Sequence, residues 1–140
     1  MPDATIQRDV AAPADTVWAI LSDFGNMSWV PGAQRVEVEG AGAGMRRHIH
    51  GSGDGPPVVE RLITIDDGAK TLTYTIDENN PLPVTTYSGE VNVADSASGS
   101  TLTWTAHFEP AGDPAEAAGI VDLMLGALTG WVAEAAEARA

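Results

Sequence analysis

The spacing of apolar and polar residues changes several times along the chain, and each change marks the border of an expected element. Residues 4–10, ATIQRDV, have the pattern of a short strand. In residues 11–24 the apolar positions then recur at helical spacing, which predicts a helix with Pro13 near its first position. We expect residues 25–32, GNMSWVPG, to form a turn or a very short second helix. The apolar positions of the first helix are Ala14, Val17, Trp18 and Leu21.

After Gly32 the pattern becomes strand-like as far as residue 110. Stretches of alternating residues are separated by turn signals such as DDGAK, DENNP and DSASGS. Because short turns join the later strands, those strands should be antiparallel. The expected strands are 33–40, 44–51, 58–66, 70–77, 83–93 and 100–110.

The C-terminal segment has the clearest helical pattern in the chain. Asp113, Pro114 and Glu116 have the spacing of an N-cap, a first helical residue and the acidic member of a capping box. The helix should span about 25 residues, or roughly 37 Å. A helix of this length can cover one face of a curved sheet, and a cavity between the two is a physical expectation. Its expected apolar stripe is Ile120, Met124, Leu128, Trp131 and Ala135, widened by Val121, Leu125 and Val132.

Composition narrows the classes of partner. The formal net charge of −13, from 20 acidic and 7 basic residues, disfavours nucleic acid and anionic membrane surfaces. The chain has no cysteine, which excludes disulfides and cysteine-based metal sites. No apolar run approaches the ~18–20 residues of a membrane span, and the N-terminal sequence lacks signal-peptide features. We therefore expect one domain over residues 1–140, cytoplasmic and without stable membrane insertion; the oligomeric state stays open, a homodimer included.

The stretch RRHIHGSGDGPP, residues 46–57, concentrates basic residues before a glycine-rich turn. His48 and His50 share one strand face, but a metal site needs further ligands and nothing places His107 beside them. The glycine turn lacks the phosphate-binding pattern and does not precede a helix. The sequence therefore predicts solvent-facing histidines and neither a metal nor a cofactor.

Several segments resemble the START-like superfamily, also called SRPBCC, which includes birch-pollen-allergen-like proteins, polyketide cyclases and plant abscisic acid receptors. They are RDVAAPADTVWAILSDFGNMSWVPG, the later GAG and ERL…DD, and a W-x-x-x-F-E-P ending before a long helix. The resemblance covers nearly the whole chain. It implies an α+β helix-grip fold: a seven-stranded antiparallel sheet curved around a long C-terminal helix, with two short helices between strands 1 and 2.

The resemblance also implies where a ligand would lie. GSGDGPPVVERL resembles the receptors' gate loop, with Gly53, Asp54, Gly55 and Pro56 at its tip, and DENNPLPVTTY lies where their latch would be. The place of the receptors' carboxylate-binding lysine holds Gln34 or Arg35, and Pro-Leu-Pro replaces the latch His-Arg pair, so a gated pocket is implied without the hormone-receptor role. The implied pocket positions are Arg47, Ile49, Glu60, Leu62, Tyr74, Ile76, Val84, Tyr87, Ile120, Met124 and Leu128.

The residues themselves leave three alternatives open. Arg47 and Glu60 form either a polar anchor for a ligand or a structural ion pair. In the last strand, either the face with Trp104 or the face with His107 points inward, and both residues are pocket candidates. The function is expected to be binding of a small hydrophobic molecule such as a lipid, polyketide or aromatic compound, the alternative being a polyketide aromatase/cyclase-type enzyme.

Overall fold

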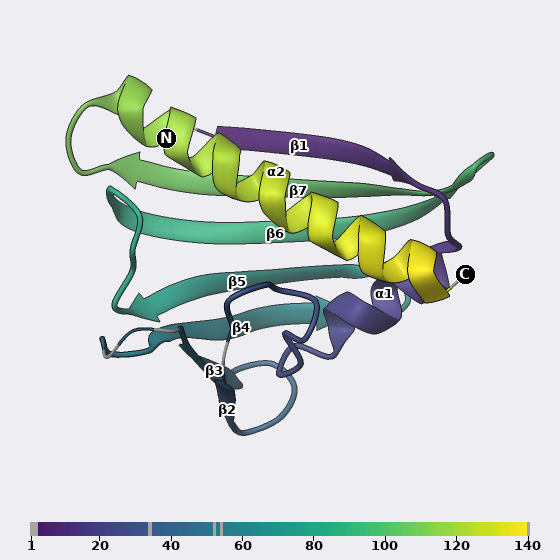
Figure 1. Cartoon of the computed structure of the whole chain (residues 1–140), viewed down its shortest axis with the longest axis horizontal. Helices are drawn as coiled ribbons and strands as arrows, with labels where there is room; N and C mark the ends of the chain where they lie inside the picture. Colours follow the sequence, from purple (N-terminus) through teal and green to yellow (C-terminus); the bar gives the residue numbers. More distant parts are fainter. Residues whose placement is uncertain (1–2, 34, 52, 54, 140) are drawn as a thin grey trace.

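The computed structural model describes residues 3–33, 35–51, 53 and 55–139. Within these residues seven strands form one antiparallel sheet, in the order β1-β7-β6-β5-β4-β3-β2, and two helices lie on it (Figure 1). This confirms the expected seven-stranded sheet with a long C-terminal helix. The elements are β1 (Asp3–Val10), α1 (Ala14–Ser22), β2 (Arg35–Glu39), β3 (Arg46–His50), β4 (Val58–Asp66), β5 (Thr71–Glu78), β6 (Val84–Ser96), β7 (Gly99–Pro110) and α2 (Pro114–Arg139).

The expected second short helix between the first two strands is not found, because residues 24–33 form a series of turns. Backbone hydrogen bonds from Asn26 N to Asp23 O and from Val30 N to Met27 O each close one turn without continuing as a helix. Pro31 has no N–H to donate, and Gly32 adopts a φ of 88°. These residues end the segment before a second helix can form.

Helix α2 lies diagonally across one face of the sheet and contacts β1, β7 and α1 (Figure 1). Its start follows the expected cap, because the Asp113 carboxylate accepts a hydrogen bond from Ala115 N at 3.0 Å. The helix is long and apolar enough to pass for a membrane span, but its buried residues form the core of the domain. They are Ala117, Val121, Leu125, Thr129, Val132, Ala133 and Ala136.

The face of α2 that is buried differs from the expected apolar stripe. Val121 and Leu125 are completely buried, whereas Met124 and Leu128 are only partly buried and Ile120 is exposed. Alanine, glycine and larger apolar residues surround much of this helix, so periodicity alone does not fix which face is buried.

Strand β7 resolves the question of its inward face in favour of Trp104. Leu102, Trp104, Ala106 and Phe108 are all buried beneath the helices. His107 lies on the opposite, outer face, where its Nδ1 is 2.7 Å from Asp3 Oδ1 of β1. The pairing of β1 with β7 runs without a register shift from Asp3 to Val10, so no bulge changes the phase along this stretch.

Candidate functional site

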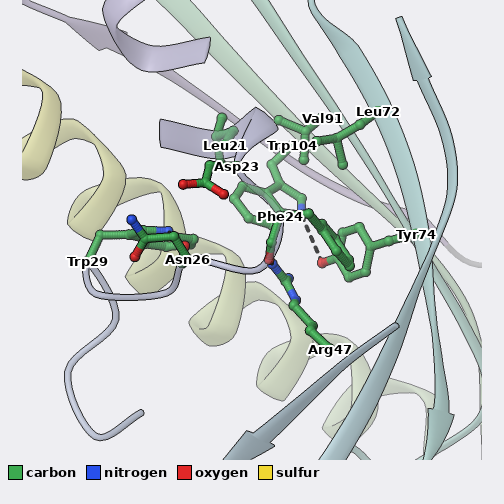
Figure 2. Close-up of a pocket in the computed structure, with 10 residues that line it drawn as sticks. All are labelled: Leu21, Asp23, Phe24, Asn26, Trp29, Arg47, Leu72, Tyr74, Val91 and Trp104. Atoms are coloured by element: carbon green, nitrogen blue, oxygen red, sulfur yellow. Dashed lines mark hydrogen bonds between the residues drawn. The ribbon is translucent and has the colours of Figure 1, made fainter. Parts of the chain in front are cut away.

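Five neighbouring strands each contribute a polar or aromatic side chain to one cluster in the interior. Arg47 comes from β3, Glu60 from β4, Tyr74 from β5, Tyr87 from β6 and Trp104 from β7; we call these five residues the interior cluster. The register places Arg47 directly opposite Glu60. Figure 2 shows Arg47, Tyr74 and Trp104 pointing toward one another. The alternation of strand residues thus brings together groups that are far apart in the sequence.

Arg47 and Glu60 form a nearly buried ion pair. The Arg47 Nη2 and Nε atoms lie 2.6 Å and 2.8 Å from Glu60 Oε1, and the two side chains are 7% and 13% exposed. Arg47 Nη1 also donates to the backbone carbonyl of Phe24 at 2.8 Å, and the guanidinium lies 3.7 Å from the centre of the Phe24 ring. Arg47 therefore fastens the turn after α1 to the sheet through a hydrogen bond and a cation–π contact.

Tyr74 and Tyr87 form a buried pair of hydroxyls. Their oxygens lie 2.9 Å apart, and the indole N–H of Trp104 donates to the Tyr74 oxygen at 3.2 Å. The two hydroxyls carry two hydrogens, and only one of these can lie between their oxygens. The second O–H has no acceptor among the described residues. The pair therefore holds one unused donor inside the domain.

Burial keeps both tyrosines in their neutral, hydrogen-donating form. It raises the pKa of Tyr74 well above its ordinary value, and the neighbouring Tyr87 and the Glu60 carboxylate raise it further. Burial likewise raises the pKa of Tyr87, although the hydrogen bond between the two hydroxyls opposes this. At neutral pH these side chains act as donors and not as bases.

A glycine on the next strand makes room for the Tyr74 ring. Gly89 of β6 pairs with Tyr74, and a Cβ at this position would stand 2.7 Å from the Tyr74 hydroxyl and closer still to its ring carbons. The Tyr74 ring lies at 90° to the Trp104 ring, with 6.2 Å between their centres. Gly89 thus sets the position of the tyrosine. A glycine inside a strand is the sequence signal that could have revealed this close approach.

A cleft opens beside the interior cluster, beneath the turns that follow α1 (Figure 2). It measures about 280 Å³, open solvent included, and the space that the centre of a water molecule can reach is about 10 Å³. As it stands the cleft has room for about one water molecule. Its walls are Leu21, Asp23, Phe24, Asn26, Trp29, Arg47, Leu72, Tyr74, Val91 and Trp104.

The sequence of residues 1–139 matches the family described as polyketide cyclase / dehydrase and lipid transport. The protein belongs to this family. Membership confirms the relation to the START-like superfamily that the sequence motifs indicated. Among curated proteins, none matches the sequence significantly.

Solved structures of similar fold include members with and without a known activity. An uncharacterised protein from Bacillus thuringiensis is 25% identical, with a TM-score of 0.82 over 96% of this chain and 98% of that one. Norcoclaurine synthase from Thalictrum flavum, in complex with dopamine and hydroxybenzaldehyde, is 21% identical, with a TM-score of 0.72 over 95% and 84%. Ara h 8.0201 is 20% identical, with a TM-score of 0.77 over 99% and 96%. The last two likenesses concern the fold alone.

The positions implied by the family resemblance fall in different environments. Arg47, Tyr74 and Trp104 line the cleft, and Glu60 and Tyr87 contact them. The fully buried Leu62 belongs to the core, while Ile120 is exposed and His107 lies on the outer face, both away from the cleft. A role in ligand binding remains a prediction for the whole set. The positions that are partly buried outside the cleft are Ile49, Ile76, Val84, Met124 and Leu128.

The described residues of the expected gate loop are not among those that line the cleft. Gly53, Gly55 and Pro56 are exposed, and Asp54 lies outside the described residues. The cleft is covered instead by Phe24, Asn26 and Trp29, which sequence reasoning did not select. An aromatic residue in a polar turn was the available signal for Trp29. The contact of Phe24 with Arg47 runs through a backbone carbonyl, which leaves no such signal.

His48 and His50 lie on the face of β3 opposite to Arg47, as the alternation indicated. His50 Nε2 is 2.6 Å from Glu37 Oε1, and His48 Nε2 is 3.4 Å from Glu39 Oε1. Across the described part of the chain, no three His, Asp or Glu side chains are arranged to hold a metal ion. The histidines belong to a network of cross-strand pairs on the outer face.

Proposed function

We propose that the protein binds a small hydrophobic molecule with an aromatic portion in the cleft between the sheet and the turns after α1. The observation that carries this proposal is the unused hydroxyl donor of the Tyr74–Tyr87 pair. A buried donor without an acceptor is unfavourable by about 1–3 kcal/mol, so the site favours a molecule that brings an acceptor oxygen. The flat walls beside it suit an aromatic ring. These walls are the side chains of Phe24, Trp29 and Trp104.

The size of the cleft requires movement. Any ligand larger than water must displace the turns that carry Phe24 and Trp29, since the strands on the other side form a continuous sheet. Trp29 is partly exposed, and its indole N–H donates only to the nearby Asn26 carbonyl at 3.2 Å. The turns are therefore the part of the wall that can open with the fewest broken contacts.

The norcoclaurine synthase of similar fold holds the small aromatic molecules dopamine and hydroxybenzaldehyde, which supports an aromatic ligand. A separate observation supports binding over a catalytic role. A cyclase-type reaction needs a general base. In the interior cluster Glu60 is ion-paired with Arg47, and the raised pKa values of Tyr74 and Tyr87 keep them protonated, so that they donate hydrogen bonds and do not act as bases. We therefore place binding ahead of cyclase chemistry.

Thermal unfolding with a panel of aromatic, polyketide and lipid compounds tests the proposal. A ligand present at 100 times its Kd should stabilise the protein by about 2.7 kcal/mol. Tyr74→Phe, which removes the hydroxyl that lines the cleft, should weaken the best ligand roughly three- to tenfold, alone or combined with Tyr87→Phe, which corresponds to one hydrogen bond.

Thr73→Val is the matched control. Thr73 is the neighbour of Tyr74 on β5 and also forms a hydroxyl pair, with Thr64 at 2.6 Å, but on the outer face. Removing this hydroxyl should leave ligand affinity unchanged. A panel without a stabilising compound, or equal losses in Thr73→Val and the tyrosine variants, would contradict binding at this site.

A further inference from the structure

The charge balance of the interior cluster narrows the class of ligand, a point that rests on the proposed function. The Arg47 guanidinium is permanently charged, and the Glu60 carboxylate in direct contact with it cancels that charge. Both side chains are almost entirely buried. A ligand carboxylate entering the cleft would find no uncompensated positive charge, and it would have to lose its hydration close to the Glu60 carboxylate.

The cluster nevertheless keeps hydrogen-bond donors to offer. A guanidinium has five N–H groups. Two of those of Arg47 are directed at Glu60 and one at the Phe24 carbonyl. The other two have no acceptor among the described residues, and neither has the second hydroxyl hydrogen of the tyrosine pair. The site therefore presents donors without net charge, which is the complement of a neutral acceptor.

The segment that covers the cleft shows what such an acceptor looks like. Phe24 gives Arg47 a neutral carbonyl oxygen at 2.8 Å and an aromatic face 3.7 Å from the guanidinium. An aromatic ketone or ester carries the same two features on one small molecule. A carboxylate of the same shape carries a negative charge, and Glu60 already neutralises Arg47.

We infer that the site takes an uncharged aromatic carbonyl compound, whose oxygen replaces the Phe24 carbonyl on Arg47, and that Glu60 excludes the corresponding carboxylate. The exchange of one carbonyl for another also accounts for the room that a ligand needs. When the ligand takes over the bond to Arg47, Phe24 and the turns that carry it are released from the sheet.

Three ligands with one ring system test the inference: 2-acetylnaphthalene, 2-naphthoate and 2-ethylnaphthalene. Their affinities are measured from the NMR signals of the four tryptophan indole N–H groups. The wild-type protein should bind the ketone at least about tenfold more tightly than the carboxylate, and also more tightly than the hydrocarbon. The Trp104 signal should shift most, because its N–H bonds within the cluster.

Glu60→Gln provides the decisive variant, because it leaves the charge of Arg47 without its partner. The preference for the ketone should shrink by about tenfold or reverse in favour of the carboxylate. Glu90→Gln makes the same change in formal charge on the outer face of β6, and it should keep the wild-type preference. The indole spectrum and thermal unfolding establish that each variant is folded.

The outcomes separate the two proposals. Equal wild-type affinity for ketone and carboxylate, or an unchanged preference in folded Glu60→Gln, overturns the inference and leaves the binding proposal standing. Binding of none of the three ligands overturns both. If Glu60→Gln does not fold, the wild-type comparison of ketone with carboxylate still decides, because it needs no variant.

Discussion

Two adjacent arginines of β3 show how differently the two faces of one strand use the same chemistry. Arg46 lies on the outer face, about 30% exposed, and is paired with Glu39, Asp77 and Glu78. Arg47 lies on the inner face, 7% exposed, and its one acidic partner is Glu60. Water and salt screen the three outer ion pairs, whereas the single inner ion pair is buried and is screened much less. The number of partners is therefore a poor guide to how much each arginine matters; its burial is the better one.

The largest expected effect comes from breaking the inner pair. Arg47→Met should lower the free energy of unfolding by about 3–5 kcal/mol, because it leaves the Glu60 carboxylate buried without a partner. Arg46→Met, the same substitution one residue earlier, should cost at most about 1 kcal/mol. Urea unfolding of both variants measures the difference. Equal losses would mean that burial does not separate the two faces.

Removing both members of the inner pair sharpens this result. Arg47→Met combined with Glu60→Leu eliminates the uncompensated charge, so it should recover much of the stability that Arg47→Met loses. Additive losses in the double variant would show that the pair is not coupled.

Alkaline pH should lower the stability of the fold through the two tyrosine hydroxyls of the inner face. Tyr74 and Tyr87 are the protein's only tyrosines, and the pKa of each is raised in the folded state from an ordinary value of 10.0. Their contribution to stability is complete below pH 10 and is lost as pH rises, because the unfolded chain releases these protons first. The loss should be about 1.4 kcal/mol per tyrosine and pH unit above 10.

Urea unfolding between pH 8 and 11 measures this decline, and Tyr87→Phe should reduce its slope. Absorbance at 295 nm gives an independent check, since its rise at alkaline pH comes from ionisation of these two side chains. A folded protein whose tyrosine absorbance rises with a midpoint near pH 10 would contradict the buried, neutral pair.

Gly89→Ala should be the next largest change, a loss of roughly 1–3 kcal/mol from overpacking. The added Cβ collides with the Tyr74 ring, although alanine would ordinarily suit a strand better than glycine. Gly119→Ala on the exposed side of α2, where a Cβ meets nothing within 4 Å, should instead stabilise by about 0.5–1 kcal/mol. Near-ultraviolet circular dichroism should show a disturbed Trp104 in the first variant only.

The smallest effect is expected on the outer face. The hydrogen bond from His50, together with the charge of Arg35, lowers the pKa of the exposed Glu37 from its ordinary value of 4.5. Its contribution is present above pH 4.5 and is lost as pH falls through the lowered pKa. His50→Gln should raise the pKa of Glu37 toward 4.5 in an NMR titration, with little change in unfolding at pH 7. A clear loss of stability at pH 7 would show that the outer network is not fully screened.

The order of the strands and the long helix followed from the sequence, whereas the inward face of the last strand did not. Alternation within RRHIH separates Arg47 from His48 and His50 once one residue is assigned to the interior. Turn signals marked the hairpins. The adjacent Pro31 and Gly32 also indicated a turn, but they did not show that turns would take the place of a second helix.

The walls of the cleft were harder to predict because they depend on contacts without local patterns. The buried side of α2 mixes alanine and threonine with valine and leucine, so its orientation follows from packing against β1, β7 and α1. Leu72 and Val91 line the cleft but have the same alternation as ordinary core residues. Glu60 and Arg47 were recognisable as a pair, and only burial shows that they form one inside the domain.

The bond between Arg47 and the Phe24 carbonyl has a consequence for how related proteins should be compared. A backbone oxygen is present whatever the side chain at position 24, so the hydrogen bond can persist when that residue changes, whereas the cation–π contact needs the Phe24 ring. Position 47 has no such freedom, since a long side chain with several donors is needed there. An alignment would show Arg47 together with its side-chain partner Glu60, and covariation would miss the hydrogen bond that joins the strand to the turn.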